Sequence, residues 1–165
     1  PLAEPQLDLY PGALREEIDQ LNEEIYPRLN NGVYRAGFAT TQESYQEACD
    51  GVFAMLDSLE NRLADGRPFL TGSEFTEADI RLFVTLIRFD AAYHGIFKCN
   101  LRPLQAYARL LGYTRRILAI PGIRETVNID HIKQGYYSIK ALNPNGIVPT
   151  GPDLGAYWPE EQHHG

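Results

Sequence analysis

Tyrosine, cysteine and histidine are the side chains of this sequence whose chemistry could support a reaction, and the chain has ten, two and four of them. Tyr34 lies in a connection rich in Asn and Gly, and Tyr136 and Tyr137 are neighbours in a late helical pattern. A tyrosine hydroxyl in an apolar pocket can orient a phenol or donate a proton, because a buried hydroxyl needs a partner. Rings that fill the core and keep one edge in water would have the same spacing, and spacing alone favours that structural interpretation at any one tyrosine.

The two cysteines favour a structural interpretation. Cys49 and Cys99 are 50 residues apart, and no Cys-x-x-Cys spacing occurs. Cys49 shares an apolar helical register with Val52 and Phe53, where a thiol is desolvated and unreactive. Cys99 follows Lys98, but no histidine partner can be identified for it. We expect two buried free thiols, although the sequence does not exclude a disulfide between them.

Metal and nucleotide chemistry find little support in the sequence. His163 and His164 follow Glu160 and Glu161 closely enough to hold a metal loosely, but a tail rarely preorganises such a site, so we expect no metal. The Gly-rich phosphate loop, the dinucleotide fingerprint, the HExxH zinc motif, the calcium loop and the GxSxG elbow are all absent from the sequence.

Length and composition indicate one globular domain that includes residues 1–165. Hydrophobic residues make up 44% of the chain and charged residues 22%. We expect a cytoplasmic protein without a membrane span, because no apolar run approaches roughly 20 residues and no basic-then-apolar leader opens the chain. The net charge of −7 argues against a nucleic-acid partner. Residues 98–140 nevertheless carry eight basic and two acidic side chains, which could form a surface for a small anionic ligand or for a partner, or could be solvated helix faces.

Helical periodicity runs through the first half of the chain. An apolar stripe begins after Pro11, and Pro27 should kink or end its helix. The connection over residues 30–39 is expected to be a turn-rich loop. A second helix is predicted to begin at Thr40, with Glu43 completing a capping box, and to end at Gly66. The residues of the first stripe are Leu14, Ile18, Leu21, Ile25 and Leu29.

The segment 76–94 should be the central helix, because it is apolar nearly all round. Thr76 as N-cap and Asp79 three residues later form a variant capping box at its start. Further helices are expected near 103–119, through Ile123 and Val127, and from Asp130. The last of these is expected to bury Ile132, Tyr136 and Ile139. The sequence thus predicts an all-α bundle of six or seven helices with an irregular C-terminal tail.

Several strings of residues resemble a known family. The segment from Leu70 to Ile80 (LTGSEFTEADI) resembles the helix start in the C-terminal domain of glutathione transferases. More specific strings narrow this resemblance to the glutathionyl-hydroquinone reductases, the Xi class of glutathione transferases, from about Leu9 to Pro152. These strings are NNGVYRAGFA at 30–39, RFD at 88–90, FKC at 97–99, PGI at 121–123, NIDHIK at 128–133 and, after Tyr136, NPNGIVP at 143–149.

The resemblance implies a mechanism and its partners. In this family a thioredoxin-like domain binds glutathione and carries a catalytic cysteine, whose thiolate takes glutathione from a glutathionyl-hydroquinone; free glutathione then resolves the mixed disulfide. Tyr34 and Tyr136 match the positions whose hydroxyls face the hydroquinone oxygens. Tyr137 points about 100° away from Tyr136 on a helix and should not share the site. The family also implies a homodimer formed largely through the helical domains.

The sequence departs from the family in one respect. It contains no thioredoxin-like half with a Cys-Pro motif, and neither Cys49 nor Cys99 fits the role of the nucleophile. The chain is therefore expected to be the substrate-binding half of such an enzyme, with little reductase activity alone. One alternative is a non-catalytic helical protein-interaction module; another is a transferase that conjugates glutathione to electrophiles. Neither alternative needs Tyr34 and Tyr136 to meet at a cavity.

Overall fold

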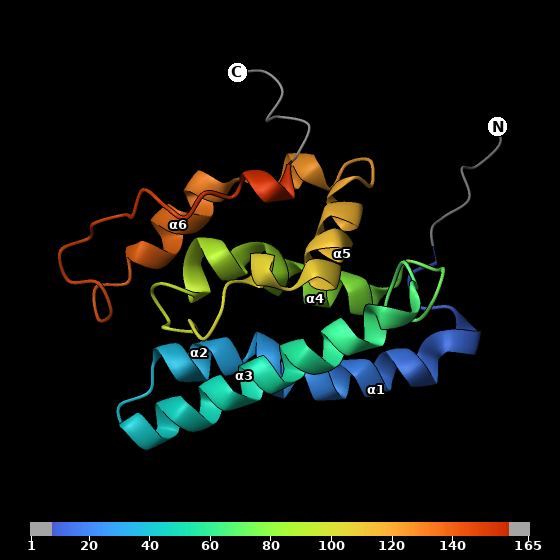
Figure 1. Cartoon of the computed structure of the whole chain (residues 1–165), viewed down its shortest axis with the longest axis horizontal. Helices are drawn as coiled ribbons and strands as arrows, with labels where there is room; N and C mark the ends of the chain where they lie inside the picture. Colours follow the sequence, from blue (N-terminus) through green and yellow to red (C-terminus); the bar gives the residue numbers. More distant parts are fainter. Residues whose placement is uncertain (1–7, 159–165) are drawn as a thin grey trace.

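Six α-helices, joined by short 3₁₀- and π-helical turns, make up residues 8–158, the part of the chain that the computed structural model describes (Figure 1). These described residues form no strand, and only a single bridge joins Phe69 and Gly72. The predicted all-α class is therefore confirmed. The helices are α1 (Arg15–Ile25), α2 (Gly32–Gly37), α3 (Gln42–Arg62), α4 (Glu77–Arg88), α5 (Ala108–Leu118) and α6 (Ile129–Tyr137).

The segment around Pro27 changes its helical form, as predicted. Because proline has no backbone N–H to donate, α1 ends at Ile25, and a π-helical turn follows over Tyr26–Asn30. The expectation of a loop over 30–39 was wrong, since residues 32–37 form α2. Gly32 allows this close packing, because a Cβ there would lie 3.1 Å from the Val52 side chain of α3. Tertiary packing thus overrides the low helix propensity of Asn and Gly.

Helix α3 begins one residue later than predicted. Its N-cap is Thr41, whose Oγ accepts a hydrogen bond from the Ser44 backbone N–H at 3.1 Å. Thr40 is therefore not the cap and Glu43 not its capping-box partner, because the register of the helix is set by its buried face. That face packs on α2 and α5 and consists of Ala48, Cys49, Val52, Phe53, Met55, Leu56 and Leu59.

Helix α4 is central, lying between the layer of α1–α3 and helix α6 (Figure 1). Phe83 and Ile87 of this helix are buried, which agrees with its predicted central position. The Asp79 carboxylate accepts the Thr76 backbone N–H at 2.8 Å, so the predicted contact across the helix start is present. The helix is not buried all round, because Val84 and Arg88 border a cavity. After Arg88 the chain forms a π-helical turn, Phe89–Tyr93.

Helix α6 packs against the π-helical turn Phe89–Tyr93, and the C-terminal tail that follows α6 runs back along this helix (Figure 1). Ile132, Tyr136 and Ile139 are half-buried rather than buried as predicted, because they line the cavity. The tail is irregular but held to the fold. The Lys133 ammonium donates to the Thr150 and Gly151 carbonyls, and the Tyr157 hydroxyl donates to Asp90 at 2.8 Å.

Candidate active site

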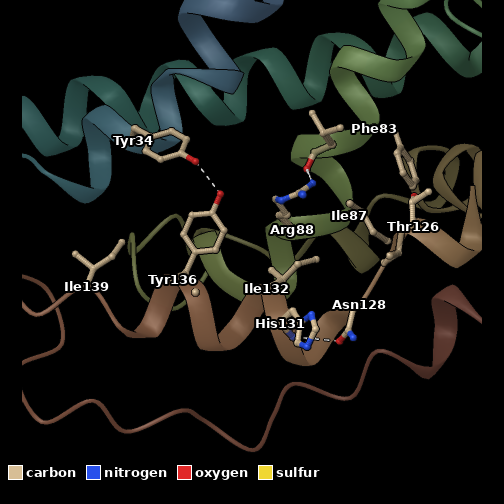
Figure 2. A pocket seen from close by; sticks show the side chains of 13 residues that line it. Tyr34, Phe83, Ile87, Arg88, Thr126, Asn128, His131, Ile132, Tyr136 and Ile139 are labelled. Carbon is tan, nitrogen blue, oxygen red and sulfur yellow. Dashed lines mark hydrogen bonds between the residues drawn. The ribbon is translucent and has the colours of Figure 1, made fainter.

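Three tyrosines from three separate elements meet through their hydroxyl groups. Tyr34 comes from α2, Tyr93 from the π-helical turn after α4, and Tyr136 from α6. The Tyr136 hydroxyl lies 2.7 Å from that of Tyr34 and 2.8 Å from that of Tyr93. Figure 2 shows the Tyr34 and Tyr136 hydroxyls pointing at each other. The two hydroxyls thus contact each other directly, although their residues are 102 positions apart in the chain.

Phe97 supports all three rings. Its ring stacks on that of Tyr93, with centroids 5.4 Å apart and an 8° angle between the planes. The Tyr34 and Tyr136 rings contact it with centroid distances of 5.1 and 5.8 Å. This approach requires a glycine at position 37, because a Cβ there would lie 2.2 Å from Phe97. The rotamers of the tyrosines are therefore fixed by packing as well as by hydrogen bonds.

Burial keeps the hydroxyls of Tyr93 and Tyr136 neutral. Tyr93 is 3% exposed, and desolvation raises its pKa well above the usual value, with a further contribution from the Tyr136 hydroxyl. Desolvation, followed by the hydrogen bond with Tyr34, also raises the pKa of Tyr136. Both groups therefore carry their protons at neutral pH and can donate them in hydrogen bonds.

The hydrogen bonds have a preferred direction. The hydroxyl of Tyr93 has Tyr136 as its hydrogen-bond partner, so its proton is best placed toward the Tyr136 oxygen. Tyr136 then donates to Tyr34, which is 39% exposed. In this arrangement the Tyr34 proton is left for an acceptor in the cavity. Each bond in such a chain polarises the next, so Tyr34 becomes a stronger donor.

A cavity of about 720 Å³ adjoins Tyr34 and Tyr136 (Figure 2). A volume of this size suits a small organic molecule. Arg88 and His131 are the lining side chains that can carry positive charge, and the lining contains no Asp or Glu. Apolar walls come mainly from α4 and α6: Phe83, Val84, Ile87, Ile132 and Ile139.

Tyr137 turns away from this cavity, as predicted. It is absent from the cavity lining and borders a different hollow, beside Asp90 and His94. Its hydroxyl lies so close to the backbone at Gly95 that a Cβ there would come within 2.2 Å of the hydroxyl oxygen. Tyr137 is therefore a packed neighbour of the site and a suitable control for it.

The two cysteines lie outside the cavity. Cys49 and Cys99 are free and buried, which confirms the expectation of two thiols. Burial raises the pKa of Cys49, and it raises that of Cys99 to about 12, so neither is a ready nucleophile.

Residues 8–158 hold no group of three metal-ligating side chains. His163 and His164 lie outside the described residues. Within the described part, no helix is long and apolar enough to cross a membrane.

Residues 42–116 match the family model described as glutathione S-transferase, C-terminal domain. The chain contains a glutathione transferase C-terminal domain. It is 52% identical over 146 residues to the glutathionyl-hydroquinone reductase PcpF of Sphingobium chlorophenolicum and, equally, to YqjG of Escherichia coli. These alignments include 88% of this chain, but 46% and 44% of the two relatives. The chain thus spans about half the length of the curated relatives it matches.

Solved structures agree with this assignment. The glutathione-bound structure of E. coli YqjG matches 91% of this chain at 50% identity, with a TM-score of 0.88 and 49% of that protein covered. A Xi-class transferase from Natrialba magadii matches 93% of this chain at 45% identity, with a TM-score of 0.89 and 47% covered. The resemblance to Xi-class transferases, drawn from short sequence strings, is therefore confirmed.

Tyr93 is the member of this site that sequence reasoning missed. It falls within the predicted central helix, segment 76–94, but it was given no role from the sequence. One signal could have found it: Phe89, Tyr93 and Phe97 recur every four residues, so three aromatic rings fall on one face of a helix. The structure places Tyr93 and Phe97 of this series around Tyr136.

Proposed function

We propose that this domain forms the hydroquinone-binding side of a glutathione-dependent reductase that removes glutathione from glutathionyl-hydroquinones. A thioredoxin-like domain of the same enzyme, outside these 165 residues, supplies the catalytic cysteine and most of the glutathione site. The observation that carries the proposal is the Tyr34–Tyr136 hydroxyl pair at the edge of a largely apolar cavity. The similarity to two proteins named glutathionyl-hydroquinone reductases supports it.

The tyrosine pair suits the bond that must break. The ring carbon that bears the sulfur first takes up a proton, which converts the ring to a keto form. The cysteine thiolate then attacks the glutathione sulfur, the carbon–sulfur bond breaks, and its electron pair passes through the ring to the carbonyl oxygen, which takes up a proton. A second glutathione then releases the cysteine, so each turnover yields one hydroquinone and one glutathione disulfide. The ring can accept the electron pair only if its oxygens tolerate negative charge. Neutral hydroxyls that donate to those oxygens stabilise that charge.

The three-tyrosine arrangement assigns different tasks to its members. Tyr34 is more than one-third exposed and adjoins the cavity, which supports its proposed contact with the ring oxygen. Tyr136 also lines the cavity and orients Tyr34. Tyr93 is buried and acts through Tyr136, which makes it a positioning residue. A protein-interaction module or a conjugating transferase would not require this convergence.

We also propose that the enzyme is a cytoplasmic homodimer that associates largely through its helical domains. The two buried free thiols fit a reducing compartment, and the resemblance to the Xi class supports the dimer. Sedimentation of the 165-residue chain at high micromolar concentration tests the assembly: a dimer is expected, and a monomer at every concentration would contradict it.

A fused enzyme tests the proposed function. This chain would replace the matching region of E. coli YqjG, so that the rest of that protein supplies the missing half. With glutathionyl-hydroquinone and excess glutathione, we expect hydroquinone and glutathione disulfide in equal amounts. YqjG itself, assayed in parallel, should release hydroquinone. The proposal would be contradicted if the fused enzyme released none under the same conditions and instead conjugated glutathione to an electrophilic arene.

A further inference from the structure

Arg88 is a cation beside the tyrosine pair that pairs with no carboxylate of residues 8–158. It ends α4 and borders the main cavity together with Tyr34 and Tyr136. It also borders a second hollow, of about 380 Å³, that shares these two tyrosines. Among residues 8–158 no acidic side chain forms a salt bridge with Arg88. The Nη1 group of Arg88 donates a hydrogen bond to the Val84 carbonyl of the same helix, at 2.8 Å.

The cavity that Arg88 borders is locally positive. Arg88 and His131 are its only lining residues that can be cationic, and the lining contains no Asp or Glu. This sign is opposite to that of the whole chain, which has a net charge of −7. The positive character therefore comes from the local arrangement and not from an overall excess of basic residues. A cavity with this lining favours an anionic ligand.

The guanidinium of Arg88 has the geometry and donors for a carboxylate. Arginine carries five N–H donors in a planar fork, and a carboxylate can accept two of them at once. The Arg88 residue is half-buried, so part of its hydration has already been given up, and an ion pair there is less screened than one at the surface. Figure 2 shows its side chain between α4 and the Tyr136 ring.

We propose that Arg88 determines substrate specificity by binding an anionic ring substituent, so that the site prefers hydroquinones that bear a carboxylate. This inference rests on the proposed function, because it takes the hydroquinone ring to lie at Tyr34 and Tyr136. The ring oxygen then contacts the tyrosine hydroxyls while the carboxylate on the same ring contacts Arg88. Apolar side chains of α4 and α6 enclose the rest of the ring.

A purely structural role for Arg88 makes a different prediction. Arg88 is the last residue of α4, where a cation interacts favourably with the helix dipole, and its bond to Val84 closes the final turn. If that were its whole purpose, replacing it would change stability without changing which ligand is preferred. The choice between ligands that differ only in charge therefore separates the two roles.

Binding of three ligands to the 165-residue chain, measured by calorimetry or by NMR titration, tests the proposal. The ligands are hydroquinone, gentisate (hydroquinone with one ring carboxylate) and gentisamide, its neutral amide. The native chain should bind gentisate about tenfold more tightly than gentisamide, equivalent to about 1.4 kcal/mol, and added salt should reduce this ratio. In Arg88→Gln the ratio should fall to near one.

Arg81→Gln is the matched control. Arg81 lies two turns earlier on α4, is exposed, contacts Glu77 and does not line the cavity. This variant should keep the native ratio. The inference would be overturned if Arg88→Gln kept the native ratio of gentisate to gentisamide affinity, or if the native chain bound both ligands equally. In either case, binding of hydroquinone would still support the proposed function. Failure of all three ligands to bind would contradict both.

Discussion

Each tyrosine hydroxyl of the site depends on hydrogen bonds with the other tyrosines for its position and its strength as a donor. The family resemblance identified Tyr34 and Tyr136 from sequence, since both lie within family-specific strings. It could not identify Tyr93, because that side chain reaches Tyr136 only through the π-helical turn Phe89–Tyr93. Nor could it show that the hydroxyls touch, because α2 was taken for a loop. Residue types could be predicted, but distances between elements far apart in sequence could not.

Tyr93→Phe should lower turnover in the fused enzyme without changing the fold. The substitution removes one hydrogen bond to Tyr136 and leaves no buried donor unpaired, because Tyr136 was the partner of the lost hydroxyl. A net hydrogen bond is worth about 0.5–1.5 kcal/mol, so kcat should fall by about two- to tenfold, with a smaller change in KM. Steady-state kinetics measures the split.

Tyr107→Phe controls for the loss of a tyrosine hydroxyl elsewhere. Tyr107 is also buried, but its hydroxyl donates to Asp57 at 3.0 Å and is absent from the cavity lining. This variant should lose some stability and keep its turnover. An equal fall in kcat in both variants would show that Tyr93 acts through general stability and not through Tyr136.

At the scale of elements, helices with clear caps and stripes could be predicted, and those shaped by tertiary contacts could not. The stripe before Pro27 and the start of α4 at Thr76 follow local rules. Helix α2 contradicts its local propensity, because its glycines serve close packing on α3 and Phe97. Helix α6 is less buried than its stripe suggested, because one face of that stripe borders the cavity.

Thr76→Ala and Asp79→Ala should have non-additive effects on stability. Asp79 is fully buried and also accepts bonds from the Leu70 N–H and the Tyr113 hydroxyl, so its loss should cost about 3–5 kcal/mol. Thr76→Ala should cost about 1 kcal/mol alone and less once Asp79 is gone, because both side chains serve the same helix end. Urea denaturation of the four proteins of the cycle measures the coupling.

Thr41→Ala supplies the comparison for this cycle. Thr41 caps a different helix, α3, through Ser44. In the double variant with Asp79→Ala, the two losses in the free energy of unfolding should add to within about 0.5 kcal/mol. Strict additivity of the Thr76 and Asp79 variants as well would rule out a shared cap at the start of α4.

At the scale of the whole molecule, hydrogen bonds from buried tyrosines join distant parts of the chain, in addition to the packing of the apolar core. Tyr113 donates to Asp79 beneath the start of α4, and Tyr157 donates to Asp90 and so ties the tail to the core. Tyr93 adds the third such contact at the site. Only the irregular form of the tail could be predicted from sequence; its return to Asp90 could not, because that contact joins residues 67 positions apart.

This arrangement predicts a loss of stability in alkali. Desolvation raises the pKa values of Tyr93, Tyr113 and Tyr157 in the folded state above the usual value near 10. The unfolded chain therefore releases protons above pH 10 that the folded chain still holds. Their contribution should be fully present below about pH 10 and fall above it, by up to about 1.4 kcal/mol per pH unit for each tyrosine.

Urea denaturation between about pH 8 and pH 11 checks this dependence, with absorbance at 295 nm reporting tyrosinate. Tyr157→Phe should reduce the slope above pH 10 by the share of one tyrosine. A flat stability curve, or tyrosinate forming near pH 10 before any unfolding, would show that these hydroxyls are not protected from ionisation.

The measurement that tests the central claim most directly is kcat/KM for glutathionyl-hydroquinone in the fused enzyme and three variants of it. Tyr34→Phe and Tyr136→Phe should each lower kcat/KM by about thirtyfold, or about 2 kcal/mol, because Tyr34 donates to the departing ring and Tyr136 donates to Tyr34. Tyr137→Phe, which removes the neighbouring hydroxyl outside the cavity, should have the native value. Native kcat/KM in both site variants, or an equal fall in Tyr137→Phe, would contradict the assignment of this tyrosine pair to the reaction.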